Sequence, residues 1–444
     1  MRRIAFATLG CKVNQYDTEG VRSLFEAEGY RVVPFDSVAD VYIVNTCTVT
    51  STGESKSRQL LRRARRRNPI ALVVAMGCYS EVAPERVEEL AVADLIFGTR
   101  GRDGIPRAVE ERIMERGSSS SEESIIQPAA EYTEFEDLTV DGWRGRTRAF
   151  VKVQDGCNRC CSYCIVPRAR GPSRSRPMES VIGEVERLAS KGYREIVLTG
   201  VELGAYGLEV GYGDSSLADL IRAVASVPEV LRVRLGSLDI RDIDEDLITV
   251  LADTPVVCRH LHLPVQSGDD GILTLMRRDY TSKAFREGID RLRSSLQGLA
   301  VSTDVIVGFP GEDRSSFQRT VSFVQKCGFS RIHVFGFSKR EGTAAASMDD
   351  QVKSGEIKAR TSELISVAED LALSHNRRHL GNEVGVLVEG LSRERWYHGL
   401  TEDYVRAEFI GDHLEPGTLV TVSVRSADYE GVYDRTEEER AASG

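Results

Sequence analysis

A dense run of cysteines, CNRCCSYC, has the most distinctive chemistry in the chain. Cys157, Cys161 and Cys164, here called the barrel triad, have the spacing C-x3-C-x2-C. Three thiolates this close together can hold three irons of one cubane iron–sulfur cluster, for which cysteine is the usual ligand. The fourth iron then lacks a protein ligand, so a small molecule can bind it and receive an electron. The alternative is a zinc site, which needs four protein ligands or three and a water. Cys160 is the only candidate nearby for the fourth.

Cysteines also follow three short apolar runs in the first part of the chain. These runs predict buried strands, and they end just before Cys11, Cys47 and Cys78, here called the sheet triad. The runs are residues 4–9, 41–46 and 72–77. Because the C-terminal ends of parallel strands share one edge, where ligands bind, we expect these thiols to converge. A single buried cysteine would be interpreted as a small apolar side chain, but three at equivalent strand ends predict a second cluster.

Helix-like stretches alternate with these strands, which is typical of an open parallel α/β sheet over residues 1–112. The stretches are residues 17–28, 54–67 and 84–90. Residues 113–142 are polar, rich in Ser and Glu and without periodicity. They therefore predict a linker.

Six further apolar runs alternate with helical segments across residues 143–375 and predict a partial (β/α)6 barrel. The runs are residues 150–153, 195–199, 232–235, 261–265, 300–307 and 332–337. The barrel triad follows the first of these strands directly, at the mouth where barrel enzymes place their chemistry. A helix is expected at 352–379. The last region, residues 376–438, has short alternating strands that predict a small antiparallel β-barrel. These strands are residues 384–388, 404–410 and 419–424.

Composition bounds the class of protein. With 444 residues, 41% of them hydrophobic and 28% charged, the chain is an ordinary globular protein of several domains. No apolar stretch is long enough for a membrane helix. The apolar run near residue 1 is too short for the core of a signal peptide. We therefore expect a cytoplasmic protein with no membrane partner, whose nine cysteines are metal ligands or reactive thiols rather than disulfides.

Charge is the second constraint from composition. The net charge of −10 argues against binding nucleic acid over the whole surface. Basic patches at residues 57–67 and 168–176 could contact phosphates, or they could be a solvated helix face and a basic loop.

Eight motifs occur along the chain in a fixed order. They are TLGCKVNQYDTE, NTCTVT, MGCYSE, GCNRCCSYCIVPRARGPSRSR, LTGVELGAYG, HLHLPVQSG, STDVIVGFPGE and FSKREGTAA. Together they closely resemble the methylthiotransferase family of radical S-adenosylmethionine (SAM) enzymes, over essentially the whole chain except the linker and the last residues. The resemblance implies an N-terminal cluster domain at 1–112, a radical SAM core at 143–375 and a TRAM domain at 376–438.

The resemblance implies two [4Fe-4S] clusters and SAM as cofactors. It implies that a cluster on the barrel triad chelates SAM and that reduction cleaves SAM to a 5′-deoxyadenosyl radical. A cluster on the sheet triad would hold the sulfur, which is methylated by another SAM before transfer. Radical chemistry of this kind, supplied by a cofactor, suits the unactivated C–H bond at C2 of an adenine.

The motif GCKVNQYDTE resembles the branch that modifies C2 of N6-threonylcarbamoyladenosine at position 37 of tRNA, in the anticodon loop. Two same-class alternatives remain, isopentenyladenosine-37 of tRNA and an aspartate of ribosomal protein S12. A non-catalytic iron–sulfur protein that binds RNA or senses redox state is the alternative from another class. An electron donor such as ferredoxin or flavodoxin and an unidentified sulfur donor are the further partners implied.

The resemblance also indicates residues for the SAM pocket. Glu202 lies where similar enzymes have a Gly-Gly-Glu motif that binds the SAM amino group, although it could instead be a solvated loop carboxylate. The other candidates, at or near later strand ends, are Ser237, Gln266, Asp304 and Gly308.

Several other side chains have two possible interpretations. His260 and His262 share one face of a strand and either line the cavity or pack inside the barrel. The pair Arg277 and Arg278 either contacts substrate or is a surface pair. The cysteines outside the triads are expected to pack structurally; they are Cys160, Cys258 and Cys327.

Overall fold

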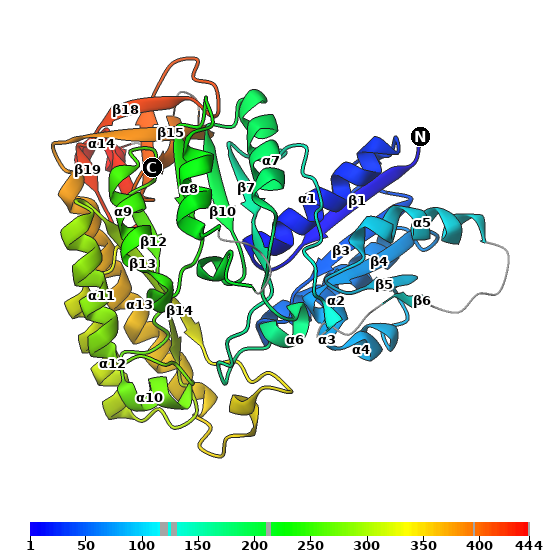
Figure 1. The fold of residues 1–444 in the computed structure, drawn as a ribbon, viewed down its shortest axis with the longest axis horizontal. Helices are drawn as coiled ribbons and strands as arrows, with labels where there is room; N and C mark the ends of the chain where they lie inside the picture. Colours follow the sequence, from blue (N-terminus) through cyan, green and yellow to red (C-terminus); the bar gives the residue numbers. More distant parts are fainter. Residues whose placement is uncertain (116–122, 126–130, 210–214, 394–395, 443–444) are drawn as a thin grey trace.

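The protein folds into three successive regions (Figure 1). The computed structural model describes residues 1–115, 123–125, 131–209, 215–393 and 396–442. Within these residues, no helix combines the length and the apolar character that crossing a membrane requires.

The first region is a six-stranded parallel sheet in the order β2-β1-β3-β4-β5-β6. Its strands are β1 (Arg3–Thr8), β2 (Arg31–Val32), β3 (Val41–Thr46), β4 (Leu72–Gly77), β5 (Leu95–Phe97) and β6 (Glu123–Ile125). Its helices are α1 (Lys12–Ala27), α2 (Ser51–Arg67), α3 (Cys78–Val82), α4 (Pro84–Glu88) and α5 (Ile105–Met114). Strand β6 comes from the segment that the sequence predicts as a linker, so part of this segment belongs to the sheet.

Helices cover both faces of this sheet. Val21 of α1 and Val109 of α5 pack against Ile43 of β3 on one face. Leu61 of α2 packs against Val44 on the other face. Both faces are buried, which is why the central strands are nearly continuous runs of apolar residues.

The second region contains two three-stranded parallel sheets, β11-β10-β7 and β12-β13-β14. Their strands are β7 (Arg148–Lys152), β10 (Glu195–Thr199), β11 (Arg232–Leu235), β12 (His260–His262), β13 (Ala300–Val307) and β14 (Arg331–Gly336). Isolated parallel bridges from Val233 to Val257 and from Ser237 to His262 continue β11 toward β12. The strands therefore follow one another in chain order around a partial barrel, as predicted.

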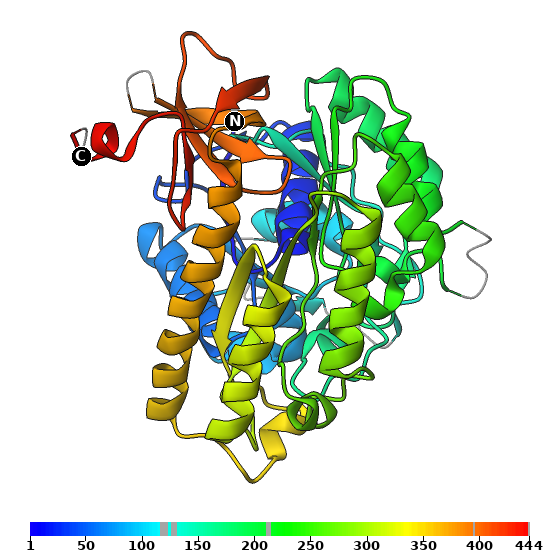
Figure 2. The ribbon, with the colours of Figure 1, turned by 90° about the vertical axis from the view of Figure 1, so that its left-hand side faces the viewer.

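Helices form the outer layer of this barrel (Figure 2). They are α7 (Met178–Ser190), α8 (Leu217–Ala225), α9 (Glu245–Asp253), α10 (Asp270–Leu275), α11 (Ser282–Ser295), α12 (Arg314–Cys327) and α13 (Ser354–Asn376). The short helix α6 (Val166–Arg170) lies instead against α3 of the first region. A short antiparallel pair, β8 (Gln154–Asp155) and β9 (Arg174–Ser175), brackets the loop that carries the barrel triad.

The third region is a curled six-stranded sheet in the order β18-β15-β16-β17-β20-β19. Its elements are β15 (Glu383–Arg393), β16 (Trp396–Thr401), β17 (Arg406–Ile410), β18 (Leu419–Ser423), β19 (Ser426–Ala427), β20 (Gly431–Tyr433) and helix α14 (Glu437–Ala442). Strands β17 and β20 run parallel, so the sheet is mixed rather than wholly antiparallel. The backbone carbonyls of Leu400 and Thr401 accept hydrogen bonds from Arg232 and Arg234, which fixes the end of β16 against the barrel.

Candidate functional site

The sheet triad converges at the carboxyl edge of the first sheet. The thiols of Cys11 and Cys78 lie 3.9 and 3.7 Å from Oδ1 of Asn14. A Cβ atom on Gly10, which has φ +101°, would lie 3.2 Å from Sγ of Cys47. The structure therefore brings together the three thiols that strand positions alone predicted to meet.

Two thiols of the sheet triad, those of Cys47 and Cys78, lie in surroundings that disfavour their charged form. Burial raises the pKa of Cys47, and it raises the pKa of Cys78 to about 12. The thiolate is the form that binds metal. A positively charged group at this site would therefore lower the pKa of these thiols again and favour the thiolate. An iron–sulfur cluster fits this donor set.

A single zinc ion does not fit the cysteine triads as they stand. Zinc lies about 2.3 Å from each sulfur ligand, so sulfurs on one ion are at most about 4.6 Å apart. In the part of the chain that the structure describes, no three cysteine sulfurs lie within 4.8 Å of one another. The wider spacing suits the several metal atoms of a cluster.

The barrel triad lies in one loop between β8 and α6. The backbone N–H of Cys164 donates to the carbonyl of Cys161 (3.0 Å), and the guanidinium of Arg278 lies 3.6 Å from the Cys161 sulfur. Burial raises the pKa of Cys164 to about 11 and also raises that of Cys157. Arg278 is buried beside the triad and is not part of a surface pair.

The remaining cysteines differ from one another. Cys258 and Cys327 are buried, as predicted. Cys160 is exposed, so the expectation that it packs inside the protein is wrong. Its neighbours turn inward in the loop and it does not.

A cavity of about 850 Å³ is lined by one chain neighbour of each triad. These neighbours are Thr48, which follows Cys47, and Ile165, which follows Cys164. Glu54, Arg168 and Arg340 supply charged groups on its walls. The triad cysteines themselves are not among its lining residues. Its volume lies in the range of pockets that hold small molecules and cofactors.

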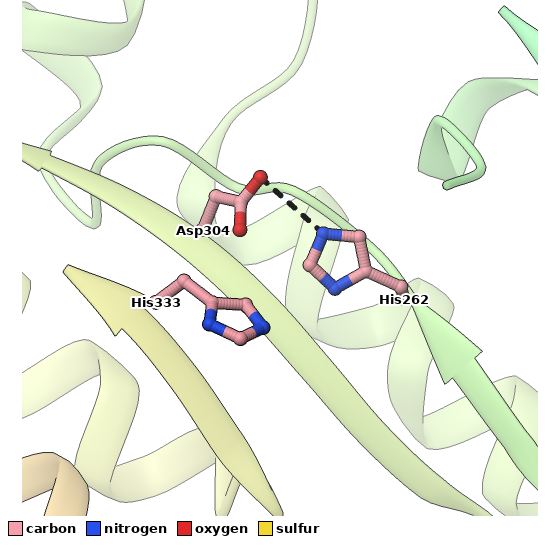
Figure 3. A group of neighbouring side chains, drawn as sticks. All are labelled: His262, Asp304 and His333. Atoms are coloured by element: carbon pink, nitrogen blue, oxygen red, sulfur yellow. Dashed lines mark ion pairs between the residues drawn. The ribbon is translucent and has the colours of Figure 1, made fainter. Parts of the chain in front are cut away.

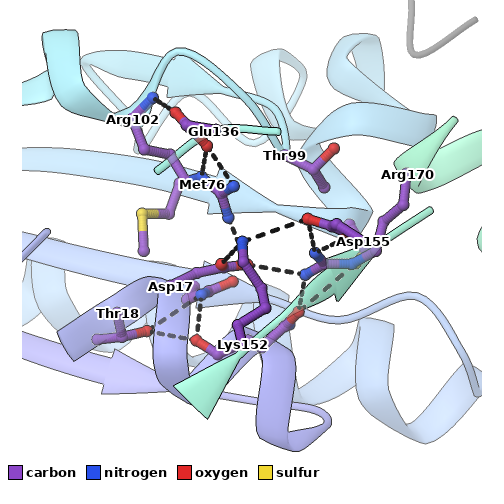
Figure 4. A network of polar contacts seen from close by, with 12 residues as sticks. Asp17, Thr18, Met76, Thr99, Arg102, Glu136, Lys152, Asp155 and Arg170 are labelled. Carbon is purple, nitrogen blue, oxygen red and sulfur yellow. Dashed lines mark hydrogen bonds and ion pairs between the residues drawn. The ribbon is translucent and has the colours of Figure 1, made fainter. Parts of the chain in front are cut away.

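A buried network of charges joins the two triads (Figure 4). Asp17 of α1 accepts from Lys152 of β7 (2.7 Å) and from Arg170 of α6 (2.9 Å). Arg170 also donates to Asp155 (2.9 Å) and to Asn14 (2.6 Å), the residue that contacts two thiols of the sheet triad. The loop of the barrel triad and the edge of the first sheet are therefore held by the same arginine.

The charges in this network stay ionised. Burial alone would raise the pKa of Asp17, but the cations Arg102, Lys152 and Arg170 outweigh it and lower the pKa to about 2. A carboxylate with several cationic partners is stable inside a protein because each charge is compensated.

The basic patch predicted at 168–176 is mostly internal. Arg170, Arg174 and Arg176 are buried, and each pairs with a carboxylate. These three arginines therefore do not contact RNA phosphates, and the prediction is wrong for them. Sequence patterns do not reveal this, because the partners Asp17 and Asp155 lie in other parts of the chain.

Glu202 lies beside the barrel triad. Its carboxylate accepts a hydrogen bond from the backbone N–H of Asn158 (3.3 Å) and pairs with Arg159. Arg159 also pairs with Asp242, so it links the triad loop to the segment after β11. The structure thus makes Glu202 part of the loop's support and not a freely solvated carboxylate.

The other residues predicted for the SAM pocket gather on strands β11 to β13. Ser237 is bridged to His262, whose ring lies 3.3 Å from the carboxylate of Asp304. Gln266 has a left-handed φ of +71°, and its N–H donates to the carbonyl of Asp304 (2.9 Å). Gly308 has φ +76°, and a Cβ there would lie 2.4 Å from Ile357 of α13, so helix packing requires this glycine. A role for these residues in SAM binding stays a prediction.

Sequence reasoning missed several residues of the site. Asn14 and Arg170 have no local signal, because their importance lies in partners far along the chain. Arg159 was also missed. A basic residue within a cysteine motif is the one clue that could have singled out Arg159.

Comparison with known proteins agrees with this arrangement. Residues 3–98 match the family described as "Uncharacterized protein family UPF0004", and residues 151–324 match the "Radical SAM superfamily". In fold, the chain is similar to the radical S-adenosylmethionine methyltransferase TsrM from Kitasatospora setae, with a TM-score of 0.56 and 17% identity over 78% of this chain and 77% of that one.

Similarity to curated proteins extends over nearly the whole chain. A threonylcarbamoyladenosine tRNA methylthiotransferase of Bacillus subtilis (strain 168) is 38% identical over 99% of this chain and 98% of its own length. The protein of the same name from Thermotoga maritima is 38% identical over 97% and 96%. A tRNA-2-methylthio-N(6)-dimethylallyladenosine synthase of Carboxydothermus hydrogenoformans is 34% identical over 94% and 95%. With two thiol triads joined through Asn14 and Arg170 and this degree of similarity, the chain belongs to the methylthiotransferase family of radical SAM enzymes, which use SAM and a [4Fe-4S] cluster.

Proposed function

We propose that this protein adds a methylthio group to C2 of N6-threonylcarbamoyladenosine at position 37 of tRNA, in the cytoplasm. The product is 2-methylthio-N6-threonylcarbamoyladenosine. Relatives named for this substrate are 34–38% identical to the chain, and those named for dimethylallyladenosine are 33–35% identical. The observation that supports the chemistry is the link through Asn14 and Arg170 that holds the two thiol triads together.

We propose that the barrel triad holds the cluster that binds SAM and that the sheet triad holds a second [4Fe-4S] cluster. When bound, the clusters and SAM supply the electron, the carbon radical and the sulfur that C2 of the adenine requires. The chain's own residues position these groups. Glu202 and Arg159 hold the loop of the barrel triad, and Arg170 fixes this loop to the edge that carries the sheet triad.

The cavity lined by Thr48 and Ile165 is the proposed reaction space. Thr48 follows Cys47 and Ile165 follows Cys164, so we propose that a base held there lies near both triads. Holding reactants in one geometry accelerates reactions strongly. A ferredoxin- or flavodoxin-type electron donor and a sulfur donor complete the proposed set of partners.

The test is nucleoside mass spectrometry of tRNA from a strain that lacks the gene, with and without a plasmid copy. We expect 2-methylthio-N6-threonylcarbamoyladenosine to disappear in the deletion and to return with the plasmid. Loss of 2-methylthio-isopentenyladenosine in its place would favour the dimethylallyladenosine branch, which the identities of 33–35% make the second candidate. Loss of methylthiolation from ribosomal protein S12 alone would overturn the proposal.

A further inference from the structure

The inner wall of the barrel has a group of polar side chains that the cysteine chemistry does not use. His262 of β12, Asp304 of β13 and His333 of β14 point toward one another (Figure 3). Nε2 of His262 lies 3.3 Å from the Asp304 carboxylate, and Nδ1 of the same ring lies 2.9 Å from the hydroxyl of Ser302. The side chains of His262 and Asp304 remain 16% and 24% exposed, so they can still contact a ligand.

Lys12 approaches this wall from the first region. It follows Cys11 directly, and its ammonium lies 5.9 Å from the centre of the Phe150 ring. It is close enough to His333 and Tyr404 to interact with both electrostatically. One side chain therefore connects the sheet triad to the inner wall of the barrel.

Lys12 differs from the other cations around it. Arg148 pairs with Glu389 (2.9 Å), and Arg234 pairs with Glu195 (2.7 Å). Lys12 makes no ion pair and no side-chain hydrogen bond with the residues described by the structure. A partly buried ammonium without a counter-ion is costly, so the site favours an anionic ligand.

A metal ion is the other ligand that two histidines and a carboxylate could hold. The surrounding charge argues against it, because Lys12 and Arg331 both disfavour positive charge at His333. The group also offers a single carboxylate to offset them. The observations therefore favour a ligand whose anionic group binds Lys12 and whose neutral polar groups contact the two histidines and Asp304.

The two tRNA substrates differ in this chemistry. The threonylcarbamoyl substituent has a carboxylate, a hydroxyl and a carbamoyl group, whereas the dimethylallyl substituent is wholly apolar. We propose that Lys12 binds the carboxylate of the threonylcarbamoyl group and that His262, Asp304 and His333 hydrogen-bond its hydroxyl and carbamoyl groups, which assigns Asp304 to the tRNA substrate and not to SAM. This inference rests on the proposed function and identifies the residues that select the substrate.

The test compares two substrates in the same enzyme. An anticodon stem-loop with N6-threonylcarbamoyladenosine at position 37 is compared with the same RNA in which the carboxylate is a methyl ester. Wild-type enzyme should prefer the acid by about 10- to 100-fold in kcat/KM, as expected for a hydrogen bond to a charged group. Lys12→Met should reduce this preference to about onefold, because the variant lacks the ammonium group with which the substrate carboxylate would pair. Lys12→Arg should retain most of it.

Each outcome decides a different point. If wild-type enzyme modifies acid and ester equally, or if Lys12→Met keeps the full preference, the inference is wrong while the proposed function stands. If wild-type enzyme modifies neither RNA but does modify a dimethylallyladenosine stem-loop, the proposed function itself fails. Zinc or manganese that copurifies with wild type and is lost from His333→Ala would overturn the assignment in favour of a metal. Iron is measured in every variant. If Lys12→Met loses its iron, the acid-to-ester ratio of kcat/KM in wild type and in Lys12→Arg still tests the inference.

Discussion

The two cysteine triads are assembled in different ways. The barrel triad lies within eight residues of one loop, so local chain geometry sets its spacing. The sheet triad comes from the ends of separate strands and depends on the whole first sheet for its geometry. A local triad can be recognised from its spacing alone, whereas a dispersed triad can be recognised only if the strand order is predicted correctly.

The triads also differ in what surrounds them. The barrel triad has Arg278 and Arg159 next to its thiols or its loop, and Cys160 in the same loop is exposed. In the sheet triad Cys47 and Cys78 are buried, and Arg170 is the cation nearby. This difference suits two separate tasks, binding a cofactor in the loop and holding sulfur at the sheet edge.

The largest effect is expected from Cys161→Ala in the barrel triad. Removing one of three ligands should abolish both SAM cleavage and methylthiolation, a loss of at least about 1,000-fold, because the cluster can no longer be held. Release of 5′-deoxyadenosine in the presence of dithionite measures the first activity, and nucleoside analysis measures the second. Cys160→Ala, in the same loop, is the matched control and should keep both.

Cys47→Ala in the sheet triad should separate the two activities. SAM cleavage should stay within about twofold of wild type, whereas methylthiolation should be lost because the second cluster is absent. The same two assays apply, with Cys258→Ala as a buried-cysteine control. Full methylthiolation by Cys47→Ala would show that SAM cleavage and sulfur insertion are not assigned to separate triads.

Asp17→Asn tests the connection between the triads. Loss of this carboxylate leaves Arg102, Lys152 and Arg170 partly uncompensated, so we expect a destabilisation of about 3 kcal/mol at neutral pH. Urea unfolding monitored by circular dichroism measures it. Asp36→Asn, which removes an exposed partner of Arg67, should change stability by less than about 1 kcal/mol.

The effect of Asp17 should depend on pH in a defined direction. Its folded pKa of about 2 is below the ordinary value of 3.8, so its ionisation stabilises the folded protein above about pH 4. This contribution is lost as the pH falls from about 4 to 2. Wild type and Asp17→Asn should therefore converge in stability over that range, and a constant difference would contradict the assigned charges.

The smallest effect is expected from Glu202→Gln. The substitution keeps the shape of the side chain but removes its charge beside Arg159 and the barrel triad. We expect the KM for SAM to rise by about tenfold, as for the loss of one charged hydrogen bond, with little change in iron content. Glu209→Gln, which removes the charge of a carboxylate bonded to Ser173 and Ser175, is the control. An unchanged KM for SAM would exclude Glu202 from the pocket.

Sequence patterns predicted the strands well where apolar runs were short and bounded. Strands β3, β4, β10, β11 and β13 have the predicted limits. Helix α1 begins at Lys12 and not at residue 17, because the chain turns into the helix directly after Gly10. Strand β6 was not predicted because its segment of the chain is polar. Strand β16 was not predicted because no alternation of apolar and polar residues marks where it begins and ends.

For the site, the sequence predicted which cysteines gather, but it did not indicate the buried charged residues that hold them in place. Thiol positions follow from motif spacing and strand ends, both of which are visible in one dimension. The partners of Asp17, by contrast, are 85 to 153 residues away along the chain, as for Arg102 and Arg170. Buried ion pairs of this kind depend on how regions pack together, and no local pattern indicates them.

Anaerobic determination of iron and sulfide in the purified protein tests the central claim most directly. Two clusters predict about eight irons and about eight sulfides per chain in wild type. A variant with Cys11, Cys47 and Cys78 replaced by alanine should retain about four of each and still cleave SAM. An unchanged iron content in that variant, or zinc in place of iron in wild type, would contradict the assignment of a separate cluster to each triad.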